Sequence, residues 1–129
     1  MQIVSALFAD DIAVRQAEGG AARIDLSGIQ FSAAAPGPFP VTVTPHLIII
    51  VRCPAEHPGT GALEVVFRRD GEQIARNVQP LQVDPGRYAY RLVRGELDYP
   101  EPGTVEAHCR IDLGEPVVVP YTLLPPVAG

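Results

Sequence analysis

The sequence contains no lysine and no tryptophan, and every one of its 10 basic residues is an arginine. Without lysine, the chain has no side-chain amine for Schiff-base catalysis and no phosphate-binding lysine of a P-loop. The formal net charge is −5, and the arginines form no stripe along the chain. We therefore expect no general nucleic-acid binding, which needs a basic surface.

Long apolar runs are also missing. No stretch approaches the roughly 18 apolar residues that cross a bilayer, so no membrane association is expected. The opening Met1–Asp10 lacks the basic start of a signal peptide, and Asp10 and Asp11 end its apolar stretch. These features predict a cytoplasmic protein, or a virion component if the gene belongs to a phage. Cys53 and Cys109 are then expected to be buried, reduced thiols, with a disulfide between them as the alternative.

Turn-forming residues are abundant, with 14 prolines and 12 glycines among 129 residues. No window of about ten residues shows helical periodicity, which predicts short strands joined by tight turns. The length and the 47% hydrophobic content suit one domain with a substantial core. We assign that domain to residues 1–124 and a C-terminal tail to residues 125–129.

Strand-like segments recur at regular intervals. Together they predict an all-β, immunoglobulin-like antiparallel β-sandwich of eight or nine strands. Pro116 and Pro120 predict that the last strand lies at a sheet edge, because proline cannot donate to a ladder. A bulge is expected at Ser27-Gly28, and Phe39 is expected to pack on the core. The segments are Gln2–Phe8, Ile12–Arg15, Arg23–Phe31, Val41–Cys53, Ala62–Arg69, Glu72–Gln79, Arg87–Arg94, Thr104–Asp112 and Pro116–Leu124.

The dipeptide Asp70-Gly71 is the clearest local signal. It lies between two strand-like runs, and a type I′ turn favours this pair because both turn residues take positive φ. A two-residue turn predicts Arg69 opposite Glu72 and Phe67 opposite Ile74.

The run Leu47–Val51 is apolar on both faces of its predicted strand. One face belongs to the sandwich core, and the other needs cover from the chain itself or from a partner. Tyr88 and Tyr90 alternate on another strand and interleave with Arg87, Arg91 and Arg94, which keeps a binding surface open there. The candidate interface residues are Leu47, Ile48, Ile50, Tyr88 and Tyr90.

Two stretches resemble a known group of proteins. The corner Leu97–Gly103, of the form L-x-x-P-x-P-G, and the alternating strand after it resemble the penultimate hairpin of bacterial Ig-like domains. The opening Ala6–Asp10 and the later Leu26–Gly28 strand are similar to the start of uncharacterised, largely actinobacterial Ig-like proteins. The resemblance implies the fold, and it carries no activity to this chain.

Few residues have the spacing of a catalytic or metal site. Cys53 and His57 are candidates for half a metal site or a Cys–His nucleophile pair. A structural zinc site needs four ligands, but the side chains of Cys109 and His108 point to opposite faces of their strand because the two residues are adjacent. Asp10, Asp11 and Glu101 are candidate carboxylates without a calcium-loop spacing. Ser5, Ser27 and Ser32 lack the G-x-S-x-G context, and Tyr88, Tyr90 and Tyr99 are a candidate stacking platform. We assign no catalytic, cofactor or metal residues.

These observations favour a non-enzymatic protein–protein interaction or assembly module that binds a protein partner or self-associates. The first alternative is a phage or virus-like structural protein, such as a capsid decoration subunit. The second is a small-ligand or metal-dependent enzyme or binder that uses the Tyr/Arg face or the Cys53–His57 loop. Function depends on sites and not on folds, so the structure of these surfaces is needed to choose among the three hypotheses.

Overall fold

The computed structural model describes residues 1–127. This part of the chain is all-β, and its one helical element is the short 3₁₀ turn Glu18–Gly20. The predicted absence of long helices is thereby confirmed, and no helix here is long and apolar enough to cross a membrane. The strands are β1 (Gln2–Gln16), β2 (Ala22–Ile29), β3 (Ser32–Ala34), β4 (Val41–Val43), β5 (His46–Arg52), β6 (Thr60–Arg69), β7 (Glu72–Gln82), β8 (Tyr88–Arg94), β9 (Leu97–Tyr99), β10 (Gly103–Ile111) and β11 (Val117–Leu124).

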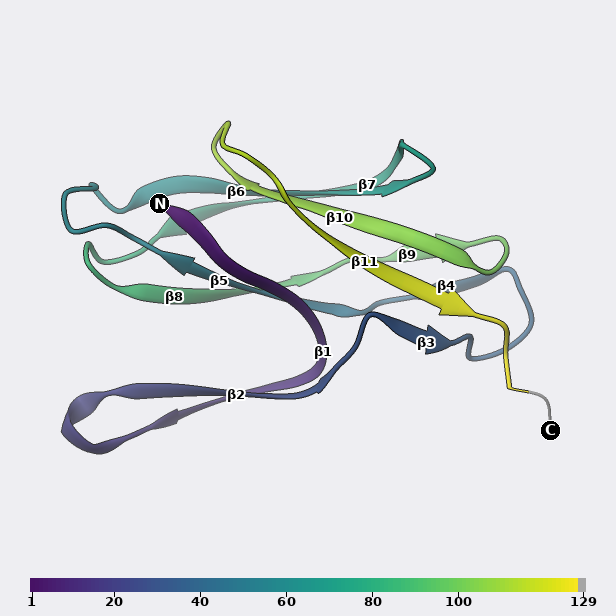
Figure 1. Cartoon of the computed structure of the whole chain (residues 1–129), viewed down its shortest axis with the longest axis horizontal. Coiled ribbons are helices and arrows are strands. Elements are labelled where there is room, and N and C mark those ends of the chain that lie inside the picture. The colour runs from purple at the N-terminus through teal and green to yellow at the C-terminus, as the bar shows by residue number, and fades with distance from the viewer. Residues whose placement is uncertain (128–129) are drawn as a thin grey trace.

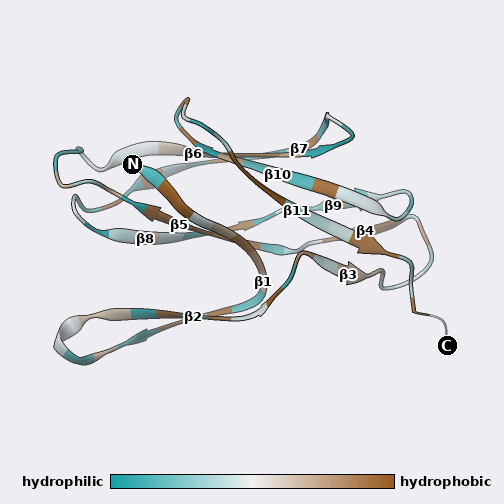
Figure 2. Ribbon diagram, viewed as in Figure 1, coloured by the Kyte–Doolittle hydropathy of each residue, from teal (hydrophilic) through white to brown (hydrophobic). Residues whose placement is uncertain are grey.

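Two sheets form the body of the molecule. Sheet A has the strand order β2-β1-β5-β8, sheet B has the order β3-β11-β10-β6-β7, and β4 pairs with β9 as a small third sheet (Figure 1). The main core draws buried side chains from both larger sheets, among them Phe8, Leu47, Phe67 and Tyr121. Apolar segments accordingly lie on β1, β5 and β11 (Figure 2). The arrangement is consistent with a β-sandwich, in which each sheet buries one face against the other.

The first strand differs from the prediction. Gln2–Phe8 and Ile12–Arg15 belong to one continuous strand, β1, which has no break at Asp10-Asp11. The β1–β2 register is the same on both sides of Gly28, so the expected bulge is absent. Gly28 instead has φ +67°, and a Cβ there would overlap the side chain of Asp10 on the paired strand. Glycine is needed at this point because of that close approach.

The hairpin β6–β7 confirms the turn and corrects the register. Asp70 and Gly71 have φ of 52° and 81°, as a type I′ turn requires, and Arg69 lies opposite Glu72. A register shift between Phe67 and Arg68 then places Phe67 opposite Ala75, where the sequence predicted Ile74. Beyond the shift, the two faces of β7 exchange, because side chains alternate along a strand. Val78, which the register of Phe67 with Ile74 would place opposite Leu63 on the inner face, is therefore 49% exposed.

The predicted long strand Val41–Cys53 is two strands that serve different sheets. β4 pairs with β9, and β5 is a central strand between β1 and β8, as its apolar faces indicated. β11 is not an edge along its whole length, because Thr122–Leu124 pairs with β3. The sequence missed β3, β4 and β9 as separate strands because each has only three residues.

Two smaller expectations concern the connector and the tail. Phe39 packs partly buried against the core, as predicted. The predicted tail begins after β11 at Pro125, and its last two residues, 128–129, lie outside the described part of the chain.

Candidate functional site

A hollow of about 590 Å³ lies between the β1–β2 hairpin and strands β5 and β8 of the same sheet. The hairpin bends back below β5 and β8 in the view of Figure 1. We call this hollow the β8 groove. Its lining is mostly aliphatic and aromatic: Val14, Ala22, Ile24, Ile50, Tyr88, Ala89, Tyr90, Arg91 and Leu92.

Strand pairing explains which side chains reach the groove. Cross-strand partners share a face of a sheet. Ile50 is paired with Tyr90 and Ile48 with Leu92, so these residues occupy the face of sheet A that points away from the main core. On the hairpin, Val14 is paired with Ile24, and the two side chains form the opposite wall.

The candidate interface residues separate into two groups. Tyr88, Tyr90 and Ile50 line the groove, and the exposed fractions of the two tyrosines are 64% and 37%. Leu47 belongs to the main core with no exposed surface, so its assignment to an interface is corrected. Ile48 lies on the outer face, yet only 1% of it is exposed. The chain itself therefore covers Ile48, and a partner is not needed for that purpose.

Strand β8 is also an edge of sheet A, pairing only with β5 in the described part of the chain. The Cys53 N–H donates to the Arg87 C=O over 2.9 Å, so Arg87 occupies a hydrogen-bonded position just before β8. Such positions alternate in antiparallel pairs, and the β5–β8 register has no break. The backbone N–H and C=O groups of Tyr88, Tyr90 and Leu92 therefore point to the free edge.

Arg91 covers part of that edge. Its guanidinium donates from Nη1 to the Tyr90 C=O over 2.7 Å and from Nη2 to the Gln82 C=O over 3.2 Å. The side chain thereby links β8 with the end of β7 across the open side of the sandwich. Charged side chains at an edge reduce unplanned strand pairing. The N–H and C=O groups of Tyr88 and Leu92 have no such cover among the contacts of the described residues.

Positive charge gathers around the ends of β8. Arg87 precedes the strand, Arg94 ends it, and Arg52 is the cross-strand partner of Tyr88. These three arginines make no ion pair within residues 1–127. Strands β5 and β8 contain no acidic residue, and the nearest acids along the chain around β8 are Asp84 and Glu96. On a chain of net charge −5, this region is locally cationic.

The Cys53–His57 pair does not have the geometry of a nucleophile and its base. The Cys53 sulfur lies 3.9 Å from His57 Nδ1, but that nitrogen accepts a hydrogen bond of 3.0 Å from the Gly59 N–H. Its lone pair is therefore engaged by the backbone, and Cys53 has no exposed surface. Within the described residues, no group of three histidine, cysteine or acidic side chains could hold a metal ion. The loop is well explained as a structural turn.

Both cysteines are free and buried, as the sequence predicted. Burial raises the pKa of the Cys109 thiol to about 12, because the thiolate loses its solvation. We expect native protein to react slowly with iodoacetamide at pH 8, since the thiolate is the reactive form. Unreduced protein in denaturant should then yield two labelled thiols by mass spectrometry. Rapid labelling of Cys109 in the native protein would show that this thiol is accessible and not buried.

The remaining candidates do not come together as a site. Asp10 accepts a hydrogen bond of 2.7 Å from Gln30 Nε2, and Asp11 accepts from the Ile12 N–H. Tyr99 is fully buried, and its hydroxyl donates to the Tyr121 C=O over 2.9 Å. Burial also raises the pKa of Tyr99. The predicted three-tyrosine platform therefore reduces to Tyr88 and Tyr90.

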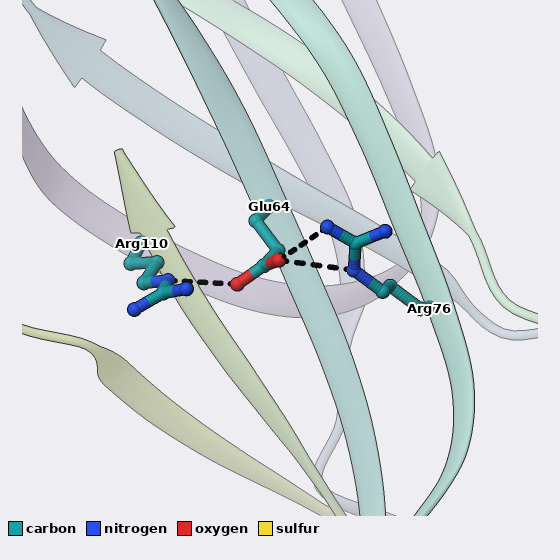
Figure 3. A network of polar contacts seen from close by, with 3 residues as sticks. All are labelled: Glu64, Arg76 and Arg110. Carbon is teal, nitrogen blue, oxygen red and sulfur yellow. Dashed lines mark hydrogen bonds and ion pairs between the residues drawn. The ribbon is translucent and has the colours of Figure 1, made fainter. Parts of the chain in front are cut away.

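The outer face of sheet B carries a charge network that sequence reasoning missed. Glu64 accepts hydrogen bonds from Arg76 over 2.7 and 3.0 Å and from Arg110 over 2.7 Å (Figure 3). The hydrogen bonds from Arg76 and then Arg110 lower the pKa of Glu64. The one signal in the sequence is Arg76, which the register of Phe67 with Ile74 would place opposite Val65 on the apolar face of the hairpin. With the carboxylate shared between two arginines, the network links β7, β6 and β10 and is structural.

Comparison of the sequence with models of known protein families found no match, and a search of curated proteins found none at a significant level. The resemblance to bacterial Ig-like proteins therefore stays a prediction.

Proposed function

We propose that this protein is a non-enzymatic protein-binding module with an immunoglobulin-like fold, and that its contact surface is the β8 groove. The observation that carries the proposal is the exposure of Tyr88, Tyr90 and Ile24 around one apolar hollow. Tyrosine and arginine are enriched at protein interfaces because they combine a large apolar surface with a polar end. Clustered apolar exposure of this kind marks interaction sites on soluble proteins.

The lining chemistry supports binding more than catalysis. The side chains around the groove include no histidine, cysteine, serine or carboxylate. Those groups perform most acid–base and nucleophilic steps, whereas the groove offers apolar area with tyrosine hydroxyls. A cytoplasmic location, which the sequence favours, fits the two free thiols and belongs to the same proposal.

Substitution of Tyr90 by glutamate is the test. The new charge lies in the groove and should abolish partner binding while the fold survives, because Tyr90 is already 37% exposed. The matched control is Val118→Glu, at a position 44% exposed on the outer face of sheet B and opposite His108. Quantitative affinity capture from source-cell extracts, with light scattering for self-association, provides the measurement. We expect one species retained by wild type and Val118→Glu and lost with Tyr90→Glu; equal retention by all three proteins contradicts the proposal.

A further inference from the structure

We propose that the β8 groove binds an extended strand of a partner protein, which pairs with the free edge of β8. The strand presents apolar side chains to the groove at alternate positions and carries carboxylates at its ends. This inference rests on the proposed function and names the partner's chemistry. It combines the free backbone groups of Tyr88 and Leu92, the apolar hollow beside them and the arginines at both ends of β8.

The backbone of β8 has the form that an added strand needs. Strand addition uses a straight edge with unpaired N–H and C=O groups. β8 has seven residues, no proline and an unbroken register with β5. The other edges are less suitable: β7 contains Pro80 and a register shift, and β3 has only three residues. The outer edge strand β2 contains Gly28 at positive φ.

The groove explains the side-chain pattern of the partner. Successive residues of an added strand point to opposite faces of the extended sheet. One set would lie beside Tyr88, Tyr90 and Leu92, which all occupy the outer face of sheet A. That set contacts the wall formed by Val14 and Ile24 on the hairpin. Apolar residues fit there, because most of the side chains that line the hollow are aliphatic or aromatic.

Charge distinguishes an acidic strand from other occupants. Arg87 and Arg94 lie at the two ends of β8, and Arg52 lies beside Tyr88, none of them in an ion pair within residues 1–127. Complementary charge increases the rate of encounter and sets the register of the bound strand. Carboxylates near the ends of an added strand therefore meet arginines that are free to receive them.

A second copy of this chain fits the edge less well. Two β8 strands in fully overlapping antiparallel register place Arg91 opposite Arg91, and like charges directly opposite are destabilising. Each copy also brings its own net charge of −5. An acidic strand instead places no like charge opposite Arg91 and brings its terminal carboxylates to Arg87 and Arg94.

The test uses a synthetic peptide of alternating valine and threonine with glutamates at both ends, titrated into the full-length protein at low salt. Backbone NMR shifts and amide hydrogen exchange report on the complex. We expect a Kd below about 1 mM, with the strongest shifts and at least about tenfold slower exchange at the amides of Tyr88, Tyr90 and Leu92. A lysine-flanked peptide should bind about tenfold more weakly.

The matched control is the same glutamate-flanked peptide with N-methyl groups on alternate amides, which blocks strand pairing and keeps the side chains. We expect it not to bind. Equal binding by the methylated peptide, equal binding by the lysine-flanked peptide, or no binding of the parent peptide each overturns the inference. Slower hydrogen exchange of the β8 amides at higher protein concentration, without peptide, also overturns the inference, because it would show that a second copy of this chain pairs with β8. Loss of a captured partner in Tyr90→Glu would still support the proposed function in all of these cases.

Discussion

Replacement of Ile48 by glutamate is expected to destabilise the protein by on the order of 4 kcal/mol, a large part of the roughly 5–15 kcal/mol that stabilises a typical domain. Ile48 lies on the outer face of sheet A, but only 1% of its surface is exposed. Its cross-strand neighbours are Leu7 and Leu92, which offer no partner for a carboxylate. The substitution therefore loses apolar burial and also places a charge where water is excluded.

Urea denaturation followed by circular dichroism measures the effect, and Ile50→Glu is the matched control on the same face. Ile50 is only partly buried at the groove, so its glutamate can reach water, and we expect a smaller loss of stability. A stably folded Ile48→Glu protein would show that the hairpin side of sheet A opens easily. It would then support the alternative that another chain normally covers this face.

Replacement of Gly59 by alanine is expected to destabilise the protein by about 3 kcal/mol, as the sum of two effects. Gly59 has φ +90°, a conformation that residues with a Cβ resist. A Cβ there would also overlap the backbone oxygen of Val83. Gly59 is tied to this segment because its C=O accepts a hydrogen bond of 2.8 Å from the Val83 N–H. Relief of the overlap would break the link between the Cys53–Gly59 loop and the end of β7.

Alanine substitutions at two other glycines separate the cost of the positive φ from the cost of the steric overlap. Thermal or urea denaturation measures the stability of each variant. Gly71 has φ +81° with open space around its Cβ position, so Gly71→Ala should cost only the conformational part, about 1 kcal/mol. Gly37 has open space and no positive φ, so Gly37→Ala should change stability by less than about 0.5 kcal/mol. Equal stabilities for Gly59→Ala and Gly71→Ala would contradict the steric part of the argument.

The sequence alone determined the features that depend on local pattern. Strand β10 is an example: Val105, Ala107, Cys109 and Ile111 alternate with polar residues in the sequence, and all four are buried. The period of two encodes one buried face, so no distant contact is needed to recognise it. The Asp70-Gly71 turn was predictable for a similar reason, since its conformation depends on the φ preferences of two adjacent residues.

Tertiary structure decided features that depend on residues far apart. The register shift at Phe67 was not visible because Ile74 and Ala75 are both apolar and both pack partly against the core. The pairing of β4 with β9 joins two three-residue segments, each too short to carry a period of its own. Local pattern reports which face is apolar and not which strand lies beside it.

The β8 groove shows the same division. The sequence identified Ile50, Tyr88 and Tyr90 as candidates because they are apolar or aromatic residues on predicted strands. It did not identify Val14 and Ile24, which reach the groove only because the β1–β2 hairpin bends back toward β8. It also placed Leu47 in the interface, although the packing of the two sheets buries that side chain completely. Alternation assigns residues to the two faces of a strand, but the packing of the whole chain decides which face stays open to a partner.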